Sequence, residues 1–214
     1  MKTSSAKPFI VGIGGTAVKG SSTEQALVAA LAVAEGAGGR TQLFGGEYLL
    51  ALPHYVPGSS VRNGHGHELI EAVRAADGLL IASPGYHGTI SGLVKNAIDY
   101  FEEMAKDERV YLDGVPVGLI ATAYGWQATG GTLSSLRSIV HALRGWPTPM
   151  GAAINTSERV FFDGVCQNQA AASQLNLVGR QVVEFAARSA PRAASHAIET
   201  TSTFATRTCH VTSQ

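Results

Sequence analysis

Short apolar runs alternate with longer amphipathic segments along most of the chain, and this alternation limits the possible folds more than any other feature. Five apolar runs, at 9–13, 41–44, 79–82, 117–123 and 150–154, have the length and composition of buried strands. Each is followed by a segment with helical spacing, at 26–35, 67–76, 93–104, 133–143 and 168–188. Strand–helix units in series predict an α/β fold: a doubly wound, five-stranded parallel sheet with helices on both faces.

The repeating pattern ends near residue 190 of the 214. We therefore expect one domain over residues 1–190. Residues 191–214 are rich in Ala, Ser and Thr, which predicts a tail that is disordered or forms an arm at a subunit interface. Residues 52–66, rich in Pro, Gly, Ser and Asn, are expected to form a loop.

The charge balance excludes several classes of partner. The formal net charge is zero, so no basic field favours nucleic acid or an anionic membrane. Only 15% of residues are charged, against an average of about a quarter, which indicates that part of the surface is buried against another subunit. The chain shows neither a signal peptide nor a transmembrane-length apolar run, so a cytoplasmic location is expected.

Three glycine-rich loops follow the first, third and fourth strands, at 14–23, 83–92 and 124–131. In an open parallel sheet, ligands bind outside the carboxyl ends of the strands, where the strand order reverses. All three loops combine glycine with hydroxyl side chains, so a ligand site is predicted where they meet.

The first loop has the composition of a phosphate site. It runs Gly14-Gly15-Thr16-Ala17-Val18-Lys19-Gly20-Ser21-Ser22-Thr23 into a helix N-terminus, where the helix dipole favours an anion. A phosphotransfer P-loop is disfavoured because Ser21 stands where that motif needs lysine. A dinucleotide fingerprint is disfavoured because the second strand, ending at Phe44, brings no acid for a ribose hydroxyl. An ordinary glycine-rich turn with a Ser/Thr cap remains an alternative.

The second loop carries the most specific motif, Ser83-Pro84-Gly85-Tyr86-His87-Gly88-Thr89-Ile90-Ser91-Gly92 followed by Lys95-Asn96 and Asp99-Tyr100. Together with the other loops it resembles the NAD(P)H-dependent FMN reductase family of the flavodoxin-like fold, over about 9–188. The resemblance implies an NAD(P)H:FMN oxidoreductase that binds FMN and takes a hydride from NADPH or NADH. The reduced flavin would serve a monooxygenase or reduce a quinone, azo compound or metal acceptor.

The resemblance also implies which residues bind the cofactor. Hydroxyls of the first loop hold the FMN phosphate, and the second and third loops contact the ring. The residues at these positions are Thr16, Lys19, Ser21, Ser22, Thr23, Pro84, Gly85, Tyr86, His87, Gly88, Tyr124, Gly125, Trp126 and Gly130. Two positions depart from the family: Val18 stands where arginine is common, and Gly85 where part of the family has an acid. Because hydride passes directly to flavin N5, no catalytic acid or base is expected.

Other interpretations remain. A flavodoxin-type electron carrier would bind FMN without using NAD(P)H itself, although a neutral surface is poorly suited to electrostatic docking. A regulatory phosphoacceptor domain would need acids after the first strand, and Gly12-Ile13-Gly14 has none. A metal site at His65 and His67 lacks a fourth ligand, so no metal is expected. Arg62, Arg109 and Arg159 are candidates to bind a 2′-phosphate.

Overall fold

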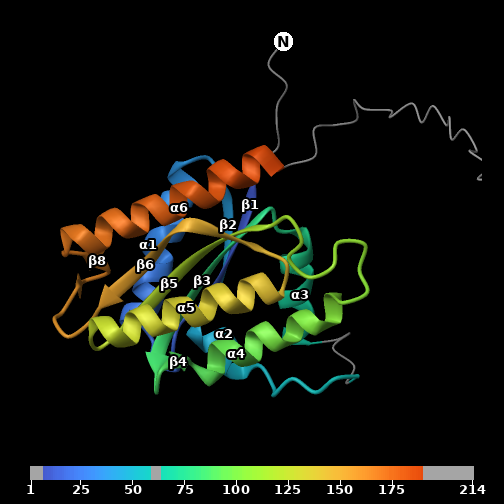
Figure 1. Cartoon of the computed structure of the whole chain (residues 1–214), viewed down its shortest axis with the longest axis horizontal. Helices are drawn as coiled ribbons and strands as arrows, with labels where there is room; N and C mark the ends of the chain where they lie inside the picture. Colours follow the sequence, from blue (N-terminus) through green and yellow to red (C-terminus); the bar gives the residue numbers. More distant parts are fainter. Residues whose placement is uncertain (1–6, 59–63, 190–214) are drawn as a thin grey trace, which may run out of the picture.

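The centre of the molecule is a sheet of five parallel strands (Figure 1). The computed structural model describes residues 7–58 and 64–189. The strands follow the order β2-β1-β3-β5-β6, so the order reverses between β1 and β3. Their bounds are β1 Phe9–Gly14, β2 Arg40–Phe44, β3 Gly78–Tyr86, β5 Pro116–Ala123 and β6 Trp146–Asn155. The predicted doubly wound parallel sheet is confirmed.

Helices cover both faces of the sheet (Figure 1). One face carries α1 (Ser22–Gly36) and α6 (Gln169–Ser189), and the other carries α3 (His65–Ala75), α4 (Gly92–Asp99) and α5 (Trp126–Ala142). Two short helices complete the set, α2 (Gly46–Ala51) and the 3₁₀ helix η1 (Tyr100–Met104). Alternate side chains of β1 pack into the hydrophobic layers on opposite faces of the sheet, Val11 and Ile13 into one and Ile10 into the other. The two-sided burial explains why the strands are continuously apolar.

Several elements differ from the sequence prediction. The helix predicted at 93–104 is divided into α4 and η1, and α5 begins at Trp126, seven residues before the predicted start. Two small hairpins were not predicted: β4 (Thr89–Ile90) pairs with the end of β3, and β7 (Phe161–Phe162) pairs with β8 (Val165–Cys166). In the segment predicted as a loop, α3 already begins at His65. The predicted tail, 191–214, lies outside the described residues.

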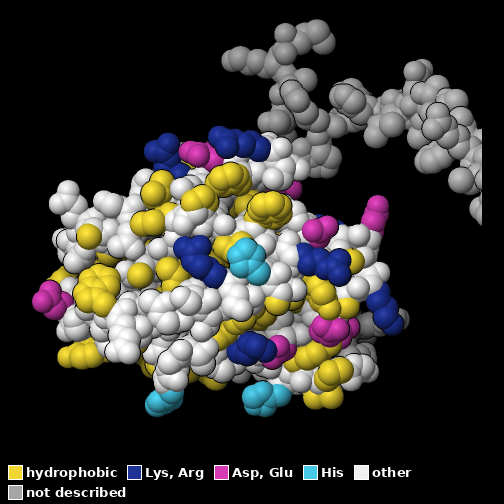
Figure 2. Space-filling view, viewed as in Figure 1, with side chains coloured by type: hydrophobic (Ala, Val, Ile, Leu, Met, Phe, Trp, Pro, Cys, Tyr) yellow, Lys and Arg dark blue, Asp and Glu magenta, His cyan; other side chains and the backbone are white. Residues whose placement is uncertain are grey.

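The visible surface has no large area of one charge. Figure 2 shows basic and acidic side chains interspersed on this face, among apolar patches. Within residues 7–58 and 64–189, no helix is long and apolar enough to cross a bilayer.

Candidate flavin site

The loops after β1, β3 and β5 lie together at the carboxyl edge of the sheet, because these strands are consecutive neighbours. One buried hydrogen bond connects the elements that carry two of these loops, α1 and β5. The hydroxyl of Thr23, in the first turn of α1, lies 2.6 Å from that of Thr122 near the end of β5, and both side chains are buried. The predicted convergence of loops distant in sequence is therefore present.

The first loop is shaped by glycines and closes on the N-terminus of α1. Gly14 has φ +154°, and a Cβ there would lie 2.2 Å from the carbonyl oxygen of Ala82, so only glycine lets this loop pass so close to β3. Ser21 caps α1, its hydroxyl accepting a hydrogen bond from the amide of Glu24 at 3.3 Å. Thr16 and Ser22 are partly buried, and Lys19 is exposed. Hydroxyls and a cation thus surround a helix N-terminus, where an anion is stabilised.

Two side chains of α1 change the sequence-based description of this loop. Thr23 was expected to bind phosphate through its hydroxyl, but that hydroxyl is buried and paired with Thr122, so it supports the loop from below. Glu24 was not predicted to matter. Its Oε2 accepts a hydrogen bond from the backbone amide of Gly20 at 3.0 Å, which places a carboxylate among the loop amides.

The second loop is a short hairpin formed by the last residues of β3 and by β4. Gly85 pairs with Ile90 and Tyr86 with Thr89, leaving His87-Gly88 as a two-residue turn. Both turn residues have positive φ, 51° and 89°, as a type I′ turn requires. Buried Ser83 fixes the base of the hairpin: its hydroxyl donates to the carbonyl of Pro84 at 2.9 Å and accepts from the amide of Ser91 at 3.0 Å.

The side chains around Gly85 explain why this position has glycine. A Cβ at this position would lie 2.4 Å from Thr132 Oγ1 and 3.0 Å from the Cβ of Ala123. The hairpin therefore packs too closely against α5 for any larger residue, and an acid cannot be accommodated here without movement.

The third loop is much shorter than predicted, because α5 begins at Trp126 and contains Gly130 and Gly131. Gly130 is exposed in the second turn of this helix, which corrects its prediction as a loop residue.

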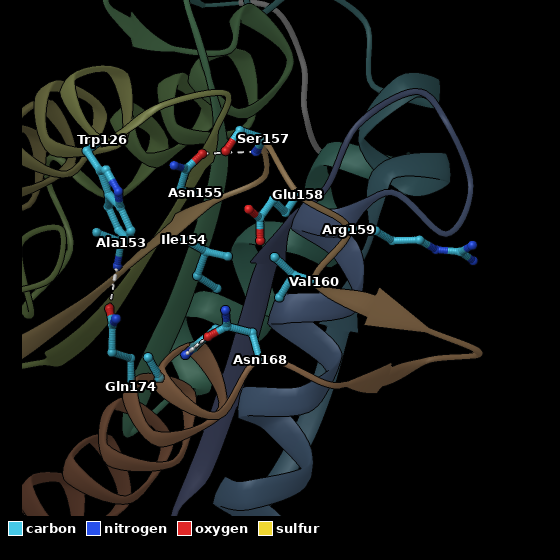
Figure 3. A pocket seen from close by; sticks show the side chains of 12 residues that line it. Trp126, Ala153, Ile154, Asn155, Ser157, Glu158, Arg159, Val160, Asn168 and Gln174 are labelled. Carbon is cyan, nitrogen blue, oxygen red and sulfur yellow. Dashed lines mark hydrogen bonds between the residues drawn. The ribbon is translucent and has the colours of Figure 1, made fainter.

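The turn between β5 and α5 consists of Tyr124-Gly125 alone. It is held by Asn155, whose Oδ1 accepts a hydrogen bond from the amide of Gly125 at 2.9 Å. The same oxygen accepts from the amide of Ser157, also at 2.9 Å (Figure 3). Asn155 was not among the predicted site residues, although an Asn two residues before Ser at a strand end is typical of an Asx turn.

A comparison with protein families covers the same strands and loops. The model of the NADPH-dependent FMN reductase family matches residues 8–158, about 70% of the chain, including all three loops. The chain belongs to this family.

Curated relatives of this chain match over a shorter segment. The FMN-dependent NADPH-azoreductase of Staphylococcus haemolyticus is 39% identical over 88 residues, 41% of this chain and 43% of that protein. The azoreductase of the same description from Staphylococcus aureus strain COL is 37% identical over 91 residues, 42% of this chain and 45% of that protein. The chain thus spans less than half the length of these curated relatives.

Solved structures match over most of the chain. An NADH:FMN oxidoreductase, EMOB, in its apo form has a TM-score of 0.65 at 22% identity and covers 85% of this chain and 90% of its own. FerB, an NAD(P)H:(acceptor) oxidoreductase from Paracoccus denitrificans, has a TM-score of 0.70 at 18% identity, with coverage of 85% and 98%. At these identities the likeness shows the fold, which is flavodoxin-like.

The residues at the carboxyl edge fit FMN. Three aromatic side chains there are largely exposed, Tyr86 at 51%, Tyr124 at 81% and Trp126 at 66%, and therefore contribute little to the core. A Cβ at Gly88 or Gly125 would meet nothing within 4 Å, so open space lies beside these backbone positions. Aromatic surface, open backbone and a phosphate-type loop on one edge match the parts of a flavin mononucleotide.

The structure also bears on the candidate metal site and on the candidate 2′-phosphate ligands. The described residues contain no group of three or more His, Cys, Asp or Glu side chains able to hold a metal ion. Arg109 does not face the site: its guanidinium donates to the carbonyls of Val73, Arg74 and Ala76 at 2.8 to 2.9 Å, capping the C-terminus of α3. Burial lowers the pKa of Arg109. Arg109 is thus a structural residue, and Arg62 lies outside the described residues.

Proposed function

We propose that this protein is an NAD(P)H-dependent FMN reductase that passes electrons from NADPH or NADH to a small-molecule acceptor. The observation that carries the proposal is the convergence of a phosphate-type loop with exposed aromatic residues and open backbone at one edge of the sheet. Quinones, azo compounds and metal oxyanions are the candidate acceptors, and a flavin-dependent monooxygenase is a candidate partner that would receive the reduced flavin. We place the reaction in the cytoplasm, where both nucleotides are available.

The chain's contribution is binding and orientation. The hydroxyls of Thr16, Ser21 and Ser22 and the ammonium of Lys19 would hold the phosphate at the N-terminus of α1. The hairpin residues Pro84, Gly85, Tyr86, His87 and Gly88 would border the flavin ring, together with Tyr124, Gly125 and Trp126. FMN, when bound, supplies the hydride acceptor at its ring nitrogen N5. Backbone amides near the ring oxygens would favour negative charge on the ring.

We further propose a homodimer or homotetramer. The support is the low charged fraction of 15% and the exposure of large apolar side chains outside the site, such as Leu50 at 59% and Val165 at 58%. Light scattering on the purified protein measures the mass directly, and a monomer would contradict this proposal.

The activity is tested by titrating the purified protein with FMN and then adding NADPH or NADH without oxygen. We expect saturable FMN binding and bleaching of the flavin absorbance band at a catalytic rate. A protein that binds FMN while neither nucleotide bleaches it is an electron carrier. Failure to bind FMN would overturn the assignment of the three loops.

A further inference from the structure

A cavity of about 200 Å³ opens beside the candidate flavin site, at the carboxyl end of β6 (Figure 3). Its walls come from the end of β6, the segment Ser157–Val160, the first turns of α6 and the side chain of Trp126. Sites that enclose a whole drug-sized ligand measure roughly 300–1,000 Å³. The cavity therefore suits one end of a larger molecule whose remainder lies outside it.

The polar groups of this cavity are held in fixed directions. The side-chain oxygen of Asn155 accepts from Gly125 and Ser157, that of Gln174 from the amide of Ala153 at 2.9 Å, and that of Asn168 from the amide of Ala171 at 3.0 Å. With all three oxygens engaged by the backbone, each carboxamide is left with its NH₂ group as a donor toward a ligand. The exposed indole of Trp126 adds an aromatic face.

Two neighbouring charged residues are placed differently. Figure 3 shows the carboxylate of Glu158 directed into the cavity and the side chain of Arg159 directed away from it. The Nε of Arg159 donates to the carbonyl of Phe161 at 3.1 Å, and its guanidinium lies 4.4 Å from the ring centroid of Phe162. The cavity thus presents an acid, while the nearby cation is engaged elsewhere.

This combination matches the adenosine half of a nicotinamide nucleotide. Carboxamide donors and an indole suit a purine, which has ring nitrogens as acceptors and a flat aromatic face. A carboxylate accepts hydrogen bonds from the 2′- and 3′-hydroxyls of ribose and repels a 2′-phosphate, which is how acids select NAD over NADP in other nucleotide sites. The chemistry therefore favours the nucleotide without the 2′-phosphate.

The cavity is also in a suitable place. Trp126 lines it and directly follows Gly125, whose amide is hydrogen-bonded to the cavity residue Asn155. The cavity and the loop expected beside the flavin ring therefore share a wall. We infer that this cavity binds the adenosine half of NADH and that Glu158 selects NADH against NADPH. The inference rests on the proposed reductase function and goes beyond it in naming the nucleotide.

The test compares wild type, Glu158→Gln and the control Asp163→Asn, which makes the same change of charge on the β7–β8 hairpin outside the cavity. With FMN present, kcat/KM is measured for NADH and for NADPH. We expect wild type and D163N to prefer NADH, and E158Q to shift the ratio toward NADPH by about tenfold, equivalent to about 1.4 kcal/mol. Calorimetry with 5′-AMP and 2′,5′-ADP should show the same shift in binding without turnover.

The outcomes separate the two proposals. If wild type uses NADPH as well as NADH, or if E158Q leaves the ratio where D163N does, the inference is wrong and the reductase function stands. If neither nucleotide is oxidised, the reductase function fails. The calorimetric comparison then still tests whether the cavity binds the adenosine half of NADH. Equal affinity for 5′-AMP and 2′,5′-ADP, or binding of neither, would overturn the role of Glu158.

Discussion

Glu24 places a carboxylate among the amides expected to hold a phosphate, where its Oε2 occupies the amide of Gly20. A bound phosphate would compete for this amide and be repelled by the charge. We expect Glu24→Gln to lower the dissociation constant for FMN about fivefold, since a charge at a helix N-terminus typically contributes 0.3–1 kcal/mol or so. Quenching of flavin fluorescence measures the constant.

The matched control is Glu35→Gln, at the other end of α1, where the carboxylate accepts from the hydroxyl of Thr41. It makes the same change of charge far from the loop and should leave the affinity for FMN unchanged. Equal effects of the two substitutions would show that only the net charge matters. Weaker binding by E24Q would mean that Glu24 organises the loop rather than competing with the ligand.

Gly85 offers a test of packing between the hairpin and α5. Because a Cβ here would lie 2.4 Å from Thr132 Oγ1, Gly85→Ala should lower the free energy of unfolding by about 1–3 kcal/mol. Thr132→Ala removes that oxygen, so in the double variant the cost of the added methyl group should be smaller. Urea denaturation of the four proteins gives the coupling. Strict additivity would show that another contact, such as Ala123, limits this position.

At the level of single residues, the sequence predicted the site unevenly. Lys19 and the aromatic residues expected at the site are exposed, as their positions in loops suggested, and their contact with a ligand stays a prediction. The sequence could not distinguish Ser22 from Thr23, since which of two adjacent hydroxyls faces the core depends on the partner, Thr122, 99 residues away. A pairing such as that of Thr23 with Thr122, between residues so distant in sequence, has no local signature.

Among the elements, the β3–β4 hairpin has the sharpest conformational requirement. His87 and Gly88 both adopt left-handed backbone conformations, and a Cβ at Gly88 would meet nothing within 4 Å. Gly88→Ala should therefore destabilise the fold by about 1 kcal/mol through its backbone alone. His87→Asn should change stability by less than about 0.5 kcal/mol, because Asn tolerates this conformation. Thermal unfolding measures both, and equal losses would contradict the turn type.

The main strands were predictable because burial on both faces makes them continuously apolar. The start of α5 was not, because two glycines in a helix interior cost roughly 1 kcal/mol each relative to alanine and are typical of a loop. Tertiary packing overrides this preference: Thr129, Thr132 and Leu136 are buried on one side of α5. The β7–β8 hairpin was missed because strands of two residues are too short to show alternation.

For the molecule as a whole, stability should depend on pH at the alkaline end. Burial, and then the hydrogen bond and charge of Glu103, raise the pKa of Tyr55 to about 12 from its ordinary 10.0. The hydroxyl of Tyr55 donates to Glu103 Oε1 at 2.9 Å, which joins the segment after α2 to η1. Since the folded state holds this proton more tightly, its contribution is complete below pH 10 and is lost as the pH rises through about 12.

Tyr55→Phe should therefore reduce the fall in unfolding free energy between pH 10 and 12, measured by urea denaturation. Some decline will remain, because the pKa of Tyr48 is also raised to about 12, chiefly by burial. Tyr124→Phe, which removes an exposed hydroxyl, is the control and should retain the wild-type slope. An unchanged slope in Y55F would mean that its hydroxyl ionises as readily in the folded protein as in the unfolded chain.

The bond between Thr23 and Thr122 has a consequence for how this protein is made. During synthesis the first loop leaves the ribosome early, but its support arrives only with β5, the strand between β3 and β6. A nascent chain that ends before β5 has a phosphate loop with a buried-type hydroxyl still unpaired and no third loop. We therefore expect FMN to bind after the sheet has folded, so that it stabilises the finished protein rather than the early stages of its folding.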